Sequence, residues 1–280
     1  MIAEDFQFSQ GNLQDYVDCP RRFQLRYLLQ VAWPAIAAEP ADEYEAQILA
    51  GQAFHRLVHQ HLLGIVAADP IGLTEMPFLE EWWRAYLDHP PADLPPLRFP
   101  EVTLSAPLGS HRLVARYDLI ALEPAGRAVI VDWKTSAKRP TTEWLVGRLQ
   151  TRVYRYLLVR AGASLWPVAS PIRPEQVEMI YWFANFPDEP ERLRYDAVQY
   201  AADGALLAEL MAEIARRDDP VFPLTTDVRR CLFCVYRSLC GRGAAAGDLA
   251  QAEDAPAGPD EAAADWADRF DFEQIAEIAF

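Results

Sequence analysis

Three stretches between residues 101 and 133 read as consecutive β-strands, and short turns separate them. They are EVTLSAPL (101–108), HRLVARYDLIAL (111–122) and AVIVDW (128–133). Gly109-Ser110 and Pro124-Ala125-Gly126 are typical turn residues, so the three strands should form an antiparallel meander. This meander constrains the fold strongly, because a sheet must bury a face against other elements.

Helical patterns flank the meander on both sides. We expect helices over 9–30, 43–66, 78–88, 142–162 and 201–219, and a further strand over 176–186. Ser9 should lie near the start of the first helix, which Pro20 should kink or split. Helices, then a meander, then helix, strand and helix indicate a mixed α/β or α+β domain.

The charge of the chain is unevenly distributed. The net charge of −15 argues at first against a polyanionic partner. The segment 244–280 nevertheless holds ten acidic residues and one arginine, whereas 130–160 holds seven basic residues and two acids. We therefore expect a globular domain over 1–243 with a locally basic centre, followed by an acidic linker and tail over 244–280.

The sequence offers no sign of a membrane segment or of secretion. No run of about eighteen apolar residues occurs, which argues against a transmembrane helix. The start, MIAEDFQFSQ, has two acids and lacks the basic region of a secretory signal. We expect a soluble, cytoplasmic protein. The motif G-x-x-x-x-G-K-[ST] is also missing, which argues against a P-loop motor.

The end of the third strand carries an acid and a lysine, Asp132 and Lys134, on the same strand face. If the preceding turn centres on Ala125, Asp118 lies directly opposite Asp132, roughly 4.5–5.5 Å away between Cβ atoms. Two such carboxylates repel each other, and a divalent cation such as Mg²⁺ or Mn²⁺ removes the conflict. Lys134 would then orient a water molecule and offset charge on a phosphate. The alternative is that Asp132 is only the first polar residue after a buried strand.

The four cysteines have the spacing of metal ligands. Cys231, Cys234 and Cys240 lie close together in CLFCVYRSLC, and Cys19 lies 212 residues before the first of them. A disulfide is disfavoured without a secretory signal. An iron–sulfur cluster and a Cys₄ zinc site remain equally open from the spacing, and unrelated core cysteines are a third interpretation.

Taken together, these motifs resemble the RecB-like branch of the PD-(D/E)XK nuclease superfamily. Within it they resemble the members with an iron–sulfur cluster, such as the AddB nuclease domain and the CRISPR-associated Cas-four-type exonucleases. Six pieces occur in the family's order over residues 9–240: YVDCPRRFQLRYL, GQAFHRLVH, ARYDLI, VDWKT, QTRVY and the cysteine triplet. Two positions depart from the usual pattern. Ala115 replaces a glycine and Trp133 replaces a tyrosine or phenylalanine, but neither change removes a ligand.

The resemblance implies a restriction-endonuclease-like fold, a mixed sheet flanked by helices, with a helical region held by a [4Fe–4S] cluster. It implies that Asp118, Asp132 and Lys134 are catalytic. It further implies Mg²⁺ or Mn²⁺ held by His55, Asp118, Asp132 and the backbone carbonyl of Trp133, and the cluster held by Cys19, Cys231, Cys234 and Cys240. The expected nucleic-acid contacts are Gln150, Tyr154, Lys138, Arg139, Arg148 and Arg152.

These residues predict a metal-dependent DNA nuclease that hydrolyses phosphodiester bonds, as an exonuclease or a single-strand or flap nuclease. DNA is the expected partner, and any helicase would be a separate chain in a repair, recombination or CRISPR-associated assembly. Two alternatives are a catalytically inactive DNA-binding module with the nuclease fold and a Cys₄ zinc-stapled scaffold. The acidic tail would be an inert solubilising segment, a DNA mimic or a peptide that docks on a partner.

Overall fold

The computed structural model of the protein describes residues 2–32, 41–65, 77–123, 126–165, 171–232 and 234–243. The turn residues 124 and 125 and the predicted acidic tail 244–280 lie outside these ranges. The predicted domain boundary at residue 243 therefore stays a prediction.

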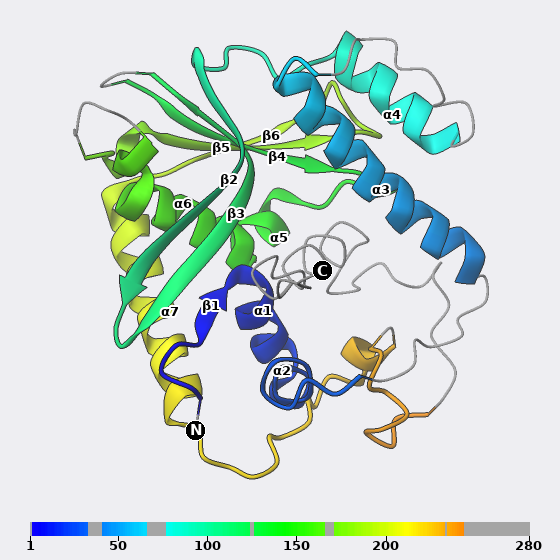
Figure 1. Ribbon diagram of the computed structural model, residues 1–280, viewed down its shortest axis with the longest axis vertical. Helices are drawn as coiled ribbons and strands as arrows, with labels where there is room; N and C mark the ends of the chain where they lie inside the picture. The colour runs from blue at the N-terminus through cyan, green and yellow to red at the C-terminus, as the bar shows by residue number, and fades with distance from the viewer. Residues whose placement is uncertain are drawn as a thin grey trace, which may run out of the picture.

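A mixed sheet of six strands forms the centre of the described structure (Figure 1). Its strands are β1 (Gln7–Ser9), β2 (Leu97–Leu108), β3 (His111–Leu122), β4 (Ala128–Lys134), β5 (Val177–Phe183) and β6 (Glu191–Arg194). β2 pairs antiparallel along β3, while β1 runs parallel to the first part of β3 and β4 antiparallel to its last part. β5 is parallel to β4, and β6 is antiparallel to β5.

The predicted meander is confirmed as β2, β3 and β4. Leu108 pairs with His111 across a two-residue turn, and Gly109 in that turn has a φ of +63°. Glycine adopts this left-handed conformation without steric cost, which is why the predicted turn falls there. The short strands β1 and β6 were not predicted, because three or four residues carry too little alternation to be recognised alone.

The helices are α1 (Gln10–Asp18), α2 (Pro20–Phe23), α3 (Ala41–Leu62), α4 (Pro77–Asp88), α5 (Thr142–Gly147), α6 (Leu149–Ala161) and α7 (Ala197–Arg216). A π-helical turn, Gln24–Leu28, follows α2, and 3₁₀ turns occupy Gly162–Leu165, Pro174–Gln176 and Val228–Cys231. Ser9 caps α1 with a capping box, and Pro20 starts α2, as predicted.

The prediction of one helix over 142–162 is wrong. Arg148 is extended, with φ −71° and ψ 142°, and divides the segment into α5 and α6. Parallel strands β4 and β5 need a crossover connection, and these two helices provide it.

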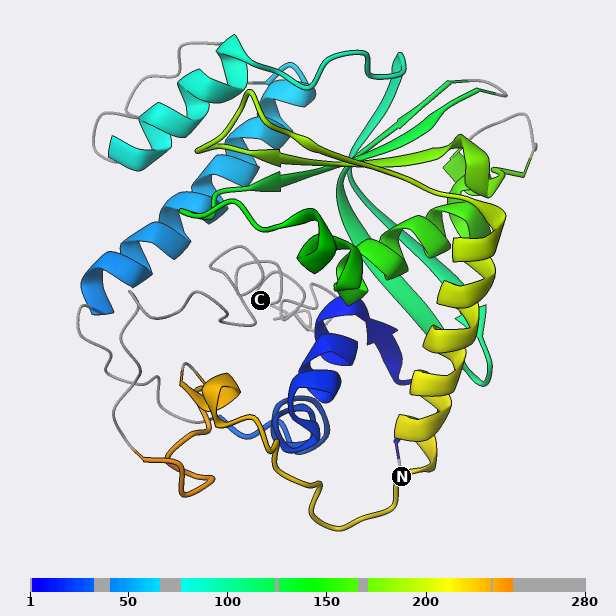
Figure 2. The same ribbon diagram turned by 180° about the vertical axis from the view of Figure 1, so that it is seen from behind.

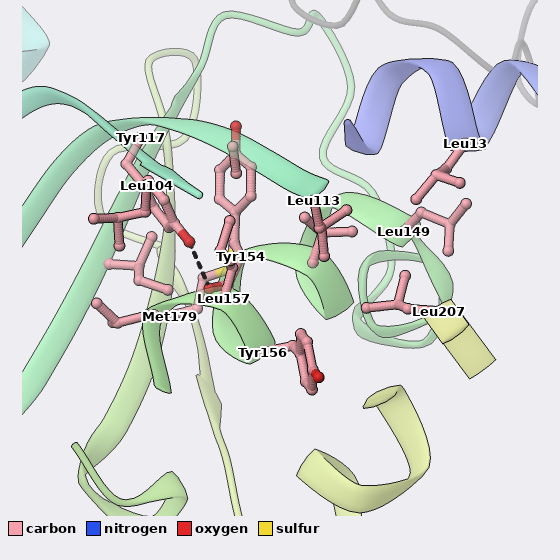
Figure 3. Packing of buried hydrophobic residues seen from close by; sticks show 14 of the residues in the cluster. Leu13, Leu104, Leu113, Tyr117, Leu149, Tyr154, Tyr156, Leu157, Met179 and Leu207 are labelled. Atoms are coloured by element: carbon pink, nitrogen blue, oxygen red, sulfur yellow. Dashed lines mark hydrogen bonds between the residues drawn. The ribbon is translucent and has the colours of Figure 1, made fainter. Parts of the chain in front are cut away.

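Helices cover both faces of the sheet (Figures 1 and 2). On one face, Phe54 of α3 and Trp82 of α4 pack with Val131 and Trp133 of β4. On the other face, α1, α6 and α7 contribute to a second cluster, in which the Tyr117 hydroxyl donates to the backbone carbonyl of Tyr154 at 2.9 Å (Figure 3). The expectation of a mixed sheet flanked by helices is thus confirmed.

None of the helices within the described ranges is long and apolar enough to span a lipid bilayer.

Candidate active site

Asp132 and Lys134 lie at the end of β4 and face helix α6. Their neighbours Val131 and Trp133 pack against α3 and α4, so the alternation of the strand turns the two charged side chains to the opposite face. Asp132 is only 2% exposed. Lys134 Nζ lies 2.8 Å from Asp132 Oδ2. Gln150 of α6 donates to Asp132 Oδ1 at 2.9 Å and accepts from Lys134 Nζ at 3.2 Å.

Asp118 lies where the pairing of β3 with β4 ends. The two strands pair over four positions, and the last of these joins Leu119 with Val131. In this register Asp118 is the next residue and falls opposite Asp132, as the position of the turn predicted. The backbone N–H of Trp133 donates to Asp118 Oδ2 at 2.9 Å. The side chain of Asp118 therefore continues the hydrogen bonding between β3 and β4 beyond their last backbone pair.

His55 and Glu101 lie on the other side of Asp118. His55 Nδ1, on α3, is 3.4 Å from Asp118 Oδ1. Glu101 interrupts the pairing of β2 with β3 at the position opposite Asp118 and has a φ of +52°, which is rare for a residue other than glycine. Arg116 Nε lies 2.6 Å from Glu101 Oε2. Glu101, Asp118 and Asp132 therefore occupy adjacent positions on three neighbouring strands.

The two aspartates differ in their ease of ionisation. Burial raises the pKa of Asp132 to about 7; Lys134 opposes this shift, and the nearby charge of Asp118 adds to it. Burial would raise the pKa of Asp118 as well. The charge and hydrogen bond of His55, the N–H of Trp133 and Lys134 outweigh burial and lower it.

The pKa of Glu101 is raised, first by burial and then by Asp118. The acidic side chains thus repel one another across the strands, and a bound cation would relieve this repulsion.

The donor chemistry fits a divalent metal, although the side chains are not arranged as a closed cage. Among the described residues, no group of three or more His, Cys, Asp or Glu side chains is gathered closely enough to hold a metal ion. Asp132 Oδ2 is buried, and the ammonium group of Lys134 lies 2.8 Å from it. Carboxylate oxygens with an imidazole suit Mg²⁺ or Mn²⁺ chemically. The predicted ligands therefore fit a metal by their chemistry, but their side chains would have to move to surround it.

Helix α6 brings Gln150 to the acid and the lysine but buries Tyr154. Tyr154 is 3% exposed, and its ring lies 4.7 Å from the ring of Tyr117, measured between centroids. Gln10 donates to its hydroxyl at 3.5 Å. Gln150 therefore contacts the candidate catalytic residues directly, whereas Tyr154 supports the helix from the core. The predicted contact of Tyr154 with nucleic acid stays a prediction.

The basic residues of this region are partly engaged within the protein. Arg152 pairs with Asp203 at 2.8 Å, and Arg139 pairs with Glu191 at 2.7 Å. Lys138 is exposed in the loop after β4. The guanidinium of Arg148 lies 4.8 Å from the centroid of the Trp144 ring. Two of the predicted nucleic-acid contacts, Arg139 and Arg152, are therefore engaged in ion pairs within the protein.

The four cysteines lie in two segments that are far apart in the sequence, and Cys19 influences the other three electrostatically. Burial raises the pKa of each thiol of the triplet, Cys231, Cys234 and Cys240, and the charge of Cys19 raises each further. All four are free thiols. They do not form a tight cluster among the described residues.

Ion pairs hold the cysteine segment against α1. Arg22 lies between Asp15 and Asp18, at 2.6 and 2.8 Å, and Arg230 also pairs with Asp18. Gln24 extends this junction by accepting from the backbone N–H of Phe222 at 2.9 Å. These contacts hold the segment around Cys19 against the segment before the cysteine triplet without the help of a metal cluster.

Comparison with known proteins identifies the family. The family model described as the PD-(D/E)XK nuclease superfamily matches residues 7–94 and 73–241. The chain belongs to this superfamily. No curated protein matches the chain.

Two solved structures are similar to this member of the PD-(D/E)XK superfamily. One is SSO0001, with 15% identity, a TM-score of 0.40, and coverage of 86% of this chain and 88% of that one. The other is described as a "putative exonuclease" from Eubacterium rectale, with 9% identity, a TM-score of 0.44, and coverage of 75% and 80%.

Proposed function

We propose that this chain is a divalent-metal-dependent deoxyribonuclease that hydrolyses phosphodiester bonds, acting on single strands, flaps or DNA ends. Membership of the nuclease superfamily supports this proposal. The observation that carries it is the pairing of buried Asp132 with Lys134 beside Asp118, with Gln150 bonded to both members of the pair. A purely structural sheet gains little from opposed carboxylates at this position.

The side chains divide the chemistry between them. Asp118, Asp132, His55 and the carbonyl of Trp133 would hold Mg²⁺ or Mn²⁺, which when bound acts as a Lewis acid on the phosphate. Lys134 orients the attacking water and offsets the charge that develops on the phosphate. Gln150 fixes Lys134 and Asp132 relative to each other through its amide.

We further propose that the chain belongs to the RecB-like branch and binds a structural [4Fe–4S] cluster through Cys19, Cys231, Cys234 and Cys240. The ion pair between Asp18, next to Cys19, and Arg230, next to Cys231, supports this assignment. Zinc in the same site is the competing occupant. Anaerobically purified protein should be brown and contain iron and sulfide; a colourless protein that contains zinc would reject the cluster.

The nuclease unit would comprise residues 1–243, and the acidic residues 244–280 would form an appended tail. The protein would work beside a separate helicase or partner in repair, recombination or CRISPR-associated processing. Truncation after Gly243 tests the tail: unchanged DNA affinity and cleavage would reject the hypothesis that it mimics DNA and occupies the site.

Cleavage of end-labelled DNA tests the main proposal. Single-stranded, flapped and duplex substrates labelled at the 5′ or 3′ end are incubated with Mg²⁺ or Mn²⁺. We expect metal-dependent products with the wild type and a large loss with Lys134→Ala. Equal cleavage by both proteins would reject the assignment of Lys134.

A catalytically inactive DNA-binding module is the second candidate. The observation in its favour is that no closed metal-ligand group exists among the described residues. It predicts DNA binding without cleavage at any concentration of Mg²⁺ or Mn²⁺.

A further inference from the structure

One tryptophan near the candidate active site differs from the others in the described ranges. Trp82, Trp83, Trp133 and Trp182 are at most 2% exposed, whereas Trp144 on α5 is 38% exposed. A tryptophan side chain gains considerable free energy when it is buried. Exposure of a single apolar residue is common and proves nothing alone, so its surroundings decide its role.

The backbone that carries Trp144 is firmly held. The hydroxyl of Thr141 caps α5 by accepting from the N–H of Trp144 at 3.3 Å. The next residue, Leu145, is buried, and its carbonyl accepts from the hydroxyl of Thr151. The ring therefore projects from a fixed support rather than from a loose loop.

Arg148 orients the ring and adds positive charge to it. Its guanidinium carbon lies 4.8 Å from the centroid of the Trp144 ring, within the range of a cation–π contact. Arg148 itself is only 8% exposed. An exposed aromatic ring next to an arginine is the combination on which unpaired nucleic-acid bases stack.

The same short segment carries Gln150 into the candidate active site. Arg148 is the N-cap of α6, and Gln150, two residues later, contacts both Asp132 and Lys134. Figures 1 and 2 show α5 between the end of β4 and the start of α6. A nucleic-acid strand with a phosphate at Lys134 would therefore pass close to α5.

We propose that Trp144 is a stacking platform for an unpaired base next to the phosphate that is cleaved. This inference rests on the proposed nuclease function and specifies its substrate, a single strand or an unwound end. Bases in a duplex already stack on one another, so a ring at this position selects strands whose bases are free.

Binding to two oligonucleotides of equal length and charge tests this role. The full-length protein is titrated, in the presence of a chelator that prevents cleavage, against labelled oligothymidylate and against a matched abasic strand. Stacking of one base contributes about 1–3 kcal/mol, so Trp144→Ala should bind oligothymidylate about 5- to 150-fold more weakly. Its affinity for the abasic strand should change less than about 2-fold, because phosphate contacts remain.

Two further variants separate stacking from general damage. Trp144→Phe keeps an aromatic face and should retain most of the affinity for oligothymidylate. Val146→Ala alters an apolar residue of the same helix that is similarly exposed, at 39%, and should match the wild type on both strands. Equal weakening of both strands by Trp144→Ala, or no weakening of either, would overturn the proposal.

The outcome is independent of whether the protein cleaves DNA. If the wild type fails to cleave with Mg²⁺ or Mn²⁺ but Trp144→Ala loses binding only to the base-containing strand, the platform stands and the nuclease proposal fails. If the wild type cleaves and Trp144→Ala binds oligothymidylate normally, the platform alone is rejected.

Discussion

Replacing Asp132 with asparagine should change how the stability of the metal-free protein depends on pH. Burial raises the pKa of Asp132 from 3.8 to about 7. A group whose pKa is raised by folding stabilises the protein fully below its unfolded-state pKa, and this contribution is lost as the pH rises through the folded-state value. Wild-type stability should therefore fall between about pH 4 and pH 7.

The size of the effect follows from the pKa difference. A shift of roughly 3 pKa units corresponds to about 4 kcal/mol, or about 1.4 kcal/mol for each pH unit within the window. Asp118 acts in the opposite direction, but its lowered pKa places its contribution at lower pH. Glu101 has a raised pKa, so the Asp132→Asn variant should keep part of the slope.

Urea denaturation in a chelator at pH 5, 6 and 7, followed by tryptophan fluorescence, measures the two slopes. The free energy of unfolding of the wild type should fall more steeply than that of Asp132→Asn. The slope carries the test, because loss of the ion pair with Lys134 shifts the whole curve of the variant. If the free energy of unfolding fell equally with pH in the two proteins, the argument that folding disfavours the ionised form of Asp132 would be refuted.

Three other perturbations test separate parts of the structure. Lys134→Ala should slow cleavage by about 10²- to 10⁴-fold in single-turnover assays, and a change below about 3-fold would contradict its role. Glu101→Gln should raise the free energy of unfolding at pH 8, because burial and then Asp118 disfavour the ionised form of Glu101 more than Arg116 favours it; destabilisation in urea titrations would oppose this reasoning. Cys19→Ser should abolish the brown colour and lower the free energy of unfolding of the loaded protein by up to roughly 5 kcal/mol, whereas a variant that retains its iron would exclude Cys19 as a ligand.

The central strands and the acid pair could be predicted from the sequence because they depend on local patterns. The turn residues on either side of β3 set its register, and that register brings Asp118 opposite Asp132. The assignment of Cys19 and the cysteine triplet to one cluster stays a prediction.

Other features depend on contacts between distant segments and could not be predicted in the same way. Arg152 pairs with Asp203 of α7, which lies 51 residues later, so its charge is not free for a phosphate as the local composition implied. The break between α5 and α6 depends on the extended backbone of Arg148. Gly147 just before it was the one available signal, and a single glycine within a helical pattern is weak evidence.

The carboxylate of Asp118 also has a structural role. It accepts a hydrogen bond from the backbone N–H of Trp133 where the backbone pairing of β3 with β4 has ended. A descendant that gave up cleavage would still need an acceptor for this N–H, so selection for folding alone would keep Asp118. Without Asp118, the N–H of Trp133 would lose this acceptor, and the strand end that carries Asp132 and Lys134 would be held less firmly. Degenerate copies of this domain should therefore keep this aspartate after cleavage is lost.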